Sequence, residues 1–373
     1  MIVLMPLDII AIILAVLHFG IPLAYFLYLR SKYLDRSWDI KGDDSYMPKV
    51  TIIVPTYNEA KLIEKKLENI YEQDYPRDKL EVIVVDSAST DGTPDLVREW
   101  ARRHPDLNLK LIVESVRKGK VYALNHALKY ATGEIVIITD VDSLWPDKET
   151  LVRALKWFAD PEVGAVSCLK RPAGSHVRGV EEGYRRYYNV LRVAESKVFA
   201  TPIFHGELAA FRRDLLVKVG GFPMDVGADD SHTATRIALM GFRAIVPEDL
   251  WVDELVPSRG YFWWRVRRAQ HLIQHFVKCL RELKCAPGEF RKVLVAEAYL
   301  HVINPYLLLL SAVLLMMSVV LAHSLVGLSA LVLGVVLLIV KQYRMWVVQQ
   351  LHLMVAGVRN LWTKELVWGM QTK

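Results

Sequence analysis

The sequence predicts an α/β protein that is attached to a membrane by about three apolar helices. Between residues 50 and 139, short β-branched apolar segments alternate with amphipathic ones, which is typical of helices wound around a mostly parallel sheet. Outside that region, residues 7–29 and 302–340 are apolar blocks long enough to cross a bilayer. With 53% hydrophobic residues among 373, the chain has room for one sizeable domain besides these helices.

The first apolar block predicts an N-terminal transmembrane anchor over residues 1–36. The basic residues that follow it at once are Arg30, Lys32 and Arg36. A cleaved signal peptide carries its basic residues before a shorter apolar core, so we interpret this anchor as uncleaved. The positive-inside rule then places residue 30 onward in the cytoplasm.

The second apolar block predicts a transmembrane hairpin over residues 301–341, with its turn near His323 and Ser324. The basic residues Lys341 and Arg344 follow this hairpin, so we expect the chain to return to the cytoplasmic side after it. This gives three spans and a multi-pass protein of the cell membrane. The tail, residues 342–373, is apolar but carries charges, so we expect an interfacial helix there; a fourth span is the alternative.

The net charge of +6 does not indicate a nucleic-acid partner, because the basic residues cluster beside the apolar segments. We expect anionic lipid headgroups to be their partners. The cysteines, Cys168, Cys279 and Cys285, form no closely spaced pair. They indicate a reducing compartment and neither a zinc site nor a disulfide framework.

The segment between the apolar blocks predicts a linker over residues 37–49 and a domain over residues 50–259. The expected strands are residues 50–54, 80–85, 109–113 and 135–139, and the expected helices are residues 60–73, 93–103 and 120–130. Helices between successive strands indicate right-handed crossovers and a parallel sheet.

Polar residues follow three of these strands: Pro55 to Glu59, then Asp86, then Asp140 and Asp142. Parallel sheets bind ligands at the carboxyl ends of their strands. In an extended segment residues two apart share a face, so Asp140 and Asp142 can both point at one Mg²⁺ or Mn²⁺ on a diphosphate. An acidic turn without a ligand is the alternative, and three such clusters at one edge argue against it.

No dinucleotide fingerprint and no P-loop follows any expected strand. A phosphate-bearing ligand must therefore be held by a metal ion and by basic side chains. Lys118 and Lys120 begin a helix whose amides also attract phosphate, although a pair of solvated lysines is the alternative. Asp86 stands where a carboxylate accepts a hydrogen bond from a ribose or a base.

Four ordered motifs resemble those of family-2 glycosyltransferases over roughly residues 48–270. The motifs are Val50 to Glu59, Asp86 to Thr93, Lys120 with Ala123-Leu124-Asn125, and Asp140-Val141-Asp142. The resemblance implies a GT-A fold, a nucleotide-diphospho-sugar donor and inversion at the anomeric carbon. It implies contacts to the donor from Pro55, Thr56, Tyr57, Glu59, Asp86, Lys120 and Asp140, with Mn²⁺ or Mg²⁺ on Asp140 and Asp142.

Inversion by single displacement needs a general base for the acceptor hydroxyl. Gly227-Ala228-Asp229-Asp230 is similar to the family's acidic pair, which implies that Asp230 is the base and Asp229 its neighbour. A helix N-cap is the alternative for this pair. The stretch beginning at His205, Gly206 and Glu207 resembles the family's acceptor side, and hydrogen-bonded structural groups are the alternative there.

Residues 260–300 are expected to form interfacial helices, because residues 260–284 are aromatic and basic together. So many cations argue against a helix packed wholly in the core. Membrane polysaccharide synthases carry Gln-x-x-Arg-Trp here, and this chain has Trp264, Arg267 and Arg268 at the corresponding positions. Only Arg267 matches, as a contact to the diphosphate. Trp264 is expected on the acceptor side.

The sequence therefore predicts an inverting, non-processive hexosyltransferase that faces the cytoplasm. It transfers one hexose, with GDP-mannose preferred over UDP-glucose as donor, to a lipid-linked acceptor, as in N-glycan or surface-glycan biosynthesis. The alternatives are a polyprenyl-phosphate glycosyltransferase and a processive polysaccharide synthase. From other classes, a nucleotidyltransferase and an inactive membrane scaffold remain.

Overall fold

The computed structural model describes residues 5–173, 178–257 and 259–364, and its centre is a seven-stranded sheet. The strands run in the order β3-β2-β1-β4-β8-β6-β9. Their bounds are β1 (Val50–Thr56), β2 (Leu80–Asp86), β3 (Asn108–Val113), β4 (Ile135–Ile138), β6 (Val163–Ser167), β8 (Ala209–Arg212) and β9 (Arg243–Ile245). Strands β1 to β4 are mutually parallel and β8 is antiparallel to β4 and β6, which confirms the mostly parallel sheet.

A second sheet of three strands stands beside the carboxyl end of β4. Its order is β5 (Ser143–Leu144), β10 (Trp251–Leu255) and β7 (Leu169–Ala173). Strand β10 runs parallel to β7 and antiparallel to β5. This small sheet brings residues from three distant segments to one side of the site described below.

The main sheet is buried on both faces because its central strands are mostly apolar, and the polar Thr51 of β1 is buried as well. Ile52 and Val54 of β1 face one core, and Ile53 faces the other. Helices α2 (Ile63–Tyr71), α3 (Thr93–Arg103) and α5 (Thr150–Leu155) cover the first face. Helices α4 (Lys120–Leu128), α7 (Arg213–Lys218), α8 (Asp229–Leu239) and α10 (Gly288–Ala298) cover the second. Each fully buried Ile or Val stabilises this packing by about 1.5–3 kcal/mol.

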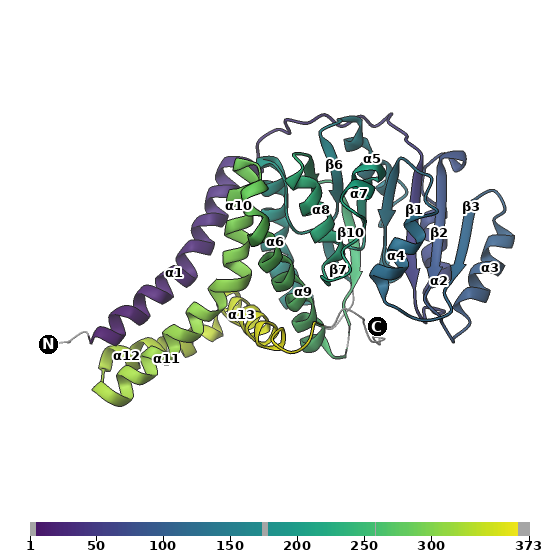
Figure 1. Ribbon diagram of the computed structural model, residues 1–373. Helices are drawn as coiled ribbons and strands as arrows, with labels where there is room; N and C mark the ends of the chain where they lie inside the picture. The colour runs from purple at the N-terminus through teal and green to yellow at the C-terminus, as the bar shows by residue number, and fades with distance from the viewer. Residues whose placement is uncertain (1–4, 174–177, 258, 365–373) are drawn as a thin grey trace.

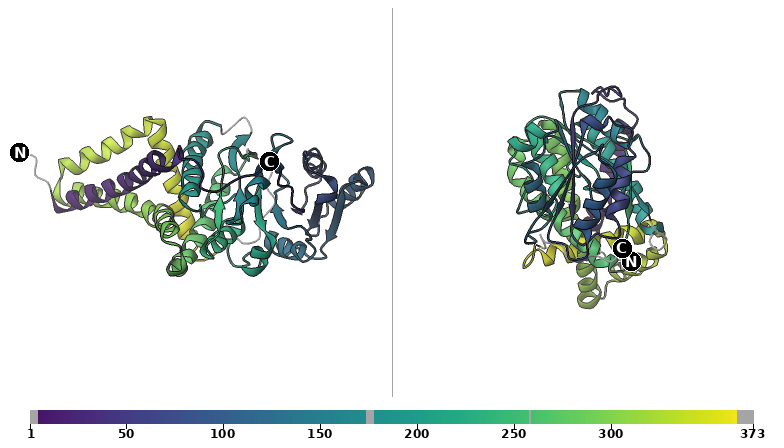
Figure 2. Two further views of the ribbon diagram at one scale, coloured as in Figure 1. Left: turned by 90° about the horizontal axis from the view of Figure 1, so that it is seen from above. Right: turned by 90° about the vertical axis from the view of Figure 1, so that its right-hand side faces the viewer.

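The apolar helices extend together from one end of the sheet domain, away from β3 (Figures 1 and 2). They are α1 (Pro6–Leu29), α11 (Asn304–Ala322) and α12 (Leu325–Val336). Polar contacts hold α1 to its neighbours: the Nδ1 atom of His18 lies 2.9 Å from the carbonyl oxygen of Asn304, and Trp346 Nε1 donates to His18 Nε2 over 2.9 Å.

Among the described residues, two helices are long and apolar enough to cross a membrane: Pro6–Leu34 and Gly288–Ala322. The expected turn lies at His323, which adopts a left-handed conformation (φ 49°). Helix α12 with its 3-10 extension covers only 15 residues, about 22 Å, before the chain bends by 107° into α13 (Lys341–Arg359). The hairpin is therefore asymmetric, and its first helix begins well before the boundary that the sequence predicts.

The aromatic and basic segment forms α9 (Tyr261–Glu282), which packs against α13 where the apolar helices meet the sheet domain (Figure 1). Phe262 and Trp263 are exposed, as the sequence predicts for an interfacial helix. Trp264 and Arg265, however, are buried. The helix tolerates buried cations because carboxylates from distant segments pair with them, as the next subsection describes.

Candidate functional site

A cavity of about 610 Å³ opens at the carboxyl ends of β1, β2 and β4 and continues between α6 (Arg178–Val198), α8 and α9. Lys118, which the sequence also offers as a phosphate contact, does not line it; this lysine is exposed, and its Nζ donates to Tyr122 Oη at 3.2 Å. The cavity collects all but one of the other site residues that the sequence predicts. Those that line it are Pro55, Thr56, Tyr57, Glu59, Lys120, Asp140, Asp142, His205, Gly206, Glu207, Asp229, Asp230, Trp264 and Arg267. The structure confirms that they meet; their individual roles stay predictions.

Asp86 is the exception, since it lies fully buried beneath the cavity floor while its neighbour Ser87 lines the cavity. Its carboxylate accepts hydrogen bonds from Thr56 Oγ1 at 3.1 Å and from the backbone N–H of Ser89 at 2.9 Å. Asp86 therefore fixes the loops after β1 and β2 against each other.

The loop after β1 is held by the loop after β2 through reciprocal hydrogen bonds. Asn58 has a positive φ of 55°, its N–H donates to Ser89 Oγ at 2.8 Å, and its Oδ1 accepts from the N–H of Thr90 at 2.9 Å. The guanidinium of Arg117 lies 3.6 Å from the centre of the Tyr57 ring, a cation–π contact at the cavity wall. A flat, positively charged surface of this kind suits the base and phosphates of a nucleotide.

Lys120, at the start of α4, stands between two acidic elements of the cavity. Its Nζ atom lies 2.7 Å from Asp140 Oδ1 and 3.9 Å from Asp229 Oδ2. Burial favours the neutral amine, but Asp140, Asp229 and Asp230 together raise the pKa of Lys120 above its usual value. The ammonium therefore stays charged inside the cavity.

Gly206 makes this arrangement sterically feasible. A Cβ atom at this position would lie 3.0 Å from Lys120 Nζ, 3.3 Å from Asp140 Oδ2 and 3.5 Å from Asp230 Oδ2. A side chain here would occupy the space that the lysine and the two carboxylates share. The sequence indicated Gly206 only through a resemblance, and the geometry supplies the physical reason for it.

The Asp229–Asp230 pair begins α8 at the opposite side of the cavity from the loop after β1. Burial and the neighbouring Asp229 carboxylate raise the pKa of Asp230 to about 7. Its Oδ1 accepts from the N–H of Ser231 at 2.6 Å, but the N-cap of α8 is Ala228 and has no side-chain cap, so the pair lies in the first turn instead of capping the helix. The Oδ2 atom lies near Gly206 in the cavity. A pKa near neutrality is what a general base needs.

Asp140 and Asp142 also fit a divalent cation, although not for the reason drawn from the sequence. Strand β4 ends at Ile138, and Val141 and Asp142 form a turn before β5 rather than an extended segment. Both carboxylates line the cavity all the same. Oxygen ligands of this type are those that Mn²⁺ and Mg²⁺ prefer.

The other side of the cavity is built from buried ion pairs. Lys170 Nζ lies 2.7 Å from Glu207 Oε1 and 2.9 Å from Glu254 Oε1, and Arg185 and Arg268 also pair with Glu254. Glu207 is thus a structural member of this group as well as a cavity residue.

The same network extends along α6 and α9. Glu181 pairs with Arg185 at 3.0 Å and with Arg265 at 3.2 Å. His205 lies beside these cations, and burial followed by Lys170 and Arg185 lowers the pKa of its imidazole well below the usual value. His205 is therefore neutral in the cavity wall.

Sequence reasoning missed most of this network. Lys170, Arg185 and Glu254 carry no motif, and Arg268 entered only as a replacement for the tryptophan of a known motif. Lys66 was missed too: it is fully buried on α2, and its Nζ donates to the carbonyl oxygen of Ser143 at 2.9 Å, beneath the Asp140–Asp142 turn. A lysine and its distant partners leave no periodic signal in a sequence.

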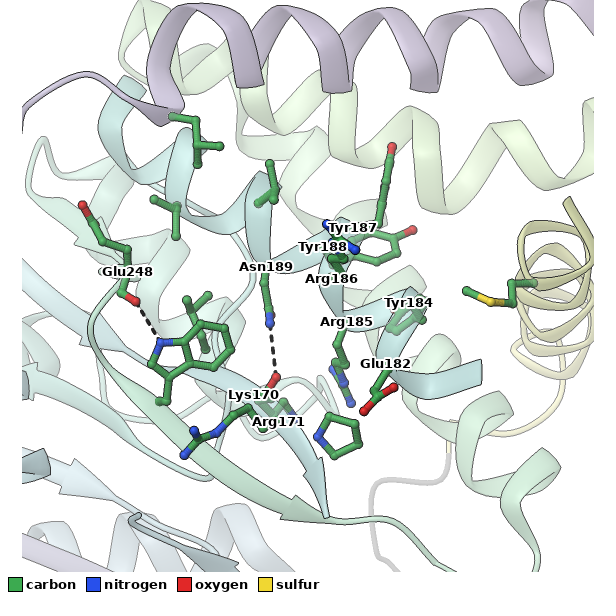
Figure 3. Close-up of a pocket in the computed structure, with 18 of the residues that line it drawn as sticks. Lys170, Arg171, Glu182, Tyr184, Arg185, Arg186, Tyr187, Tyr188, Asn189 and Glu248 are labelled. Atoms are coloured by element: carbon green, nitrogen blue, oxygen red, sulfur yellow. Dashed lines mark hydrogen bonds between the residues drawn. The ribbon is translucent and has the colours of Figure 1, made fainter. Parts of the chain in front are cut away.

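A second cavity of about 1640 Å³ adjoins the first (Figure 3). The two share the side chains of Tyr184, Arg185, Tyr188, Asn189 and Gln349. Figure 3 shows the side chain of Asn189 hydrogen-bonded to the backbone of Lys170, and Tyr184, Tyr187 and Tyr188 on α6. The lining of this second cavity also includes residues 34–38 and Lys341, which follow the apolar helices. Seven of its side chains are cationic and four are acidic, so it suits an anionic ligand.

Comparisons with known proteins agree with this geometry. A family model described as glycosyl transferase family 2 matches residues 51–220. The solved structure of the mannosyltransferase PcManGT from Pyrobaculum calidifontis, in complex with GDP-Man and Mn²⁺, is 58% identical with a TM-score of 0.89. The match covers 96% of this chain and 100% of that one.

Two curated relatives are more distant. A dolichyl N-acetyl-alpha-D-glucosaminyl phosphate 3-beta-D-2,3-diacetamido-2,3-dideoxy-beta-D-glucuronosyltransferase from Methanococcus voltae is 39% identical over 29% of this chain and 33% of that protein. A beta-monoglucosyldiacylglycerol synthase from Synechocystis is 28% identical over 70% of this chain and 56% of that protein. The matches thus span between a third and about half of these relatives' length.

Proposed function

The chain belongs to glycosyltransferase family 2, and from this premise we propose that it is a metal-dependent, inverting mannosyltransferase that uses GDP-mannose. Support for the donor is the full-length likeness to a mannosyltransferase whose structure holds GDP-Man and Mn²⁺. UDP-glucose is the second candidate donor. The reaction type rests on one observation in the cavity: Lys120 and Asp140 face the Asp229–Asp230 pair across Gly206.

The proposed reaction is a single displacement. The acceptor hydroxyl gives its proton to the carboxylate of Asp230 while its oxygen forms a bond to the anomeric carbon of the sugar. The bond from that carbon to the diphosphate breaks on the opposite face, and the nucleoside diphosphate leaves. Lys120 and Arg267 stabilise the negative charge of the leaving group. Asp229 keeps the pKa of Asp230 high enough to accept the proton.

The donor would lie along the loops after β1 and β2, with its base against Tyr57 and Arg117 and its diphosphate near Lys120. Asp140 and Asp142 would hold Mn²⁺ or Mg²⁺. When bound there, the ion neutralises charge on the diphosphate. Asp86 would act by holding the loops, through Thr56 and Ser89, rather than by direct contact.

We propose that the acceptor is a lipid-linked glycan or a polyprenyl phosphate that reaches Asp230 through the second cavity. The supporting features are its excess of cations, its aromatic wall on α6 and its position beside the apolar helices. The relatives named above include one whose substrate is a dolichyl phosphate sugar. In the topology that we propose, the chain crosses the membrane several times with the catalytic domain on the cytoplasmic side.

Transfer would stop after one hexose. Where processive synthases place an acceptor-stacking tryptophan, this chain has Arg268. Its guanidinium forms an ion pair with Glu254 and lies 4.8 Å from the centre of the Trp264 ring. Holding a growing chain needs a stacking surface and a conduit through the membrane, and two or three apolar helices, the number found among the described residues, are too few to enclose one.

The deciding experiment is a donor screen with the detergent-purified full chain, extracted lipids as acceptors and Mn²⁺ present. We expect GDP release from GDP-mannose that depends on lipid, and a product whose mass increases by one hexose. If UDP were released from UDP-glucose and no GDP from GDP-mannose, the donor would be UDP-glucose instead. A ladder of hexose additions would favour the polysaccharide synthase, and pyrophosphate release would favour the nucleotidyltransferase. No release with any donor would favour the inactive scaffold.

A further inference from the structure

A cluster of three potential metal ligands lies behind the catalytic acids, outside the site described above. His232 is on α8, two residues after Asp230, and His275 and Cys279 are one turn apart on α9. All three are buried. Residues four apart on a helix project from the same face, so α9 presents an imidazole and a thiol together to α8.

The distances within the cluster match one face of a tetrahedral zinc site. His232 Nδ1 lies 3.2 Å from His275 Nδ1. Cys279 Sγ lies 3.4 Å from His275 Nδ1 and 3.9 Å from His232 Nδ1. With Zn–N of about 2.05 Å and Zn–S of about 2.3 Å, tetrahedral angles place two nitrogens about 3.4 Å apart and sulfur about 3.6 Å from nitrogen. The three ligand atoms therefore have nearly the spacing that coordination of one zinc ion requires.

The protonation states and surroundings also favour a ligand. Burial lowers the pKa of His232 to about 4 and that of His275 well below its usual value, so both imidazoles keep a lone pair for a metal. The backbone of Pro202 hydrogen-bonds the ring of His275, a contact that commonly orients metal-bound imidazoles.

We propose that His232, His275 and Cys279 bind one zinc ion, whose fourth ligand is a water molecule. Binding displaces the thiol proton of Cys279 to solvent, because a coordinated thiol is deprotonated. Nitrogen and sulfur ligands select zinc over Mn²⁺ and Mg²⁺, so this site is chemically distinct from the one at Asp140 and Asp142.

The zinc ion would join the helices that carry the two halves of the catalytic cavity. Helix α8 begins with Asp229 and Asp230, and α9 carries Trp264 and Arg267. A bond between them fixes the proposed base relative to the membrane-side wall. The sequence prediction that excluded zinc considered only closely spaced cysteine pairs, and this cluster combines residues 47 positions apart.

The test is metal content and a cobalt spectrum, neither of which depends on glycosyl transfer. The full chain is expressed with added zinc, purified in detergent and washed with a weak chelator, and its zinc is measured by mass spectrometry. We expect one zinc per chain, loss of that zinc in Cys279→Ser and His275→Ala, and retention in Cys285→Ser, a matched control in which the thiol is exposed. Cobalt in place of zinc should show thiolate-to-cobalt charge-transfer absorption that Cys279→Ser lacks.

Thermal unfolding keeps the proposal testable if a variant folds poorly. Chelator-stripped wild-type protein that is already saturated with Mn²⁺ should melt at a still higher temperature after one equivalent of zinc is added, because zinc then binds a site that Mn²⁺ does not fill. A wild-type protein that retains no zinc, shows no cobalt–thiolate band and melts unchanged with zinc would overturn the proposal. Equal zinc content in folded Cys279→Ser and wild type would overturn it as well.

Discussion

On one wall of the cavity, hydrogen bonds between short loops place polar side chains toward the open space, whereas on the other wall charged side chains are buried and paired with one another. The first, the donor wall, comprises residues 55–59, 86–91, 117–120 and 140–142. The second, the acceptor wall, comprises Lys170, Glu181, Arg185, Glu207, Glu254, Arg265 and Arg268. Donor-wall groups such as Tyr57 and Asp142 line the cavity, and Lys170 on the acceptor wall is fully buried.

The difference indicates that the two walls do different work. Substitutions on the donor wall change what the cavity can bind, because its groups face the ligand. Substitutions on the acceptor wall leave a charge buried without a partner, which costs stability before it affects chemistry. The four cations of this wall outnumber its three carboxylates, so it also leaves a positive field for an anionic ligand.

The largest expected effect is on the donor wall. Asp142→Asn should reduce transfer to the background rate, and chelation of the wild type should do the same, because the diphosphate then lacks its cation. Added Mn²⁺ should restore the wild type but not the variant. Melting in detergent should show that the variant remains folded, so that its loss of activity reflects the missing carboxylate. Full activity in excess chelator would contradict the metal assignment.

The next effect concerns the acids between the walls. Asp230→Asn removes the proposed base but keeps its shape, so the turnover number should fall by at least about 10²-fold while donor affinity is unchanged. Steady-state kinetics with GDP-mannose measures both quantities. Asp214→Asn, an exposed acid on α7, is the control. If Asp229→Asn were the more severe change, the two acids would have to exchange roles.

The pH profile offers a separate test of the same pair. Asp230 accepts a proton only as a carboxylate, and burial with Asp229 raises its pKa to about 7. The ratio kcat/KM should therefore fall as pH decreases through about 7. Removing the neighbouring charge in Asp229→Asn should lower the pKa of Asp230 and shift this fall to lower pH. If kcat/KM fell at the same pH in Asp229→Asn as in the wild type, Asp229 would not be the group that raises the pKa of Asp230.

The acceptor wall should respond in stability instead. Glu254→Gln leaves Lys170, Arg185 and Arg268 around a neutral group, which costs about 3–5 kcal/mol and lowers the melting temperature by roughly 10 °C. Fluorescence-detected melting in detergent measures this, with Asp253→Asn on the same strand as the control, because Asp253 is half-buried and its partner Arg171 is exposed. A variant that melts like wild type but binds acceptor poorly would show that the wall acts by contact rather than by stability.

The sequence predicted the donor wall far better than the acceptor wall. Pro55, Asp86, Asp140 and their neighbours lie at the carboxyl ends of β1, β2 and β4, which are neighbours in the sheet, and the rule that parallel strands share a carboxyl edge places them together. Glu181 and Arg265 are 84 positions apart, so no local pattern in the sequence indicates that they pair. The sequence therefore predicted lipid headgroups as the partners of the cations of α9. The pairing that buries them exists only once α6, α9 and β10 pack.

The same reasoning explains the apolar helices. Hydropathy gives the position of an apolar block but not where a helix begins or bends. It predicted the turn at His323 and missed that α10 and α11 form one helix from Gly288, because a π-helical segment, Tyr299–Ile303, joins them. The bend after Val340 follows from packing of α13 against α9, which no window of the sequence contains.

The smallest effect tests the link between the acceptor wall and the membrane. Arg186 on α6 and Lys341 at the start of α13 are exposed and line the second cavity. If this cavity admits a lipid phosphate, each charge contributes about 1 kcal/mol, so Arg186→Gln or Lys341→Gln should raise the acceptor KM roughly fivefold. The donor KM and the melting temperature should not change, because neither residue contacts the donor wall or the buried network. Lys218→Gln, an exposed lysine on α7 outside both cavities, should leave the acceptor KM unchanged. An unchanged acceptor KM in both cavity variants would require the acceptor to enter by another route, and the contrast between the walls would then end at the active site.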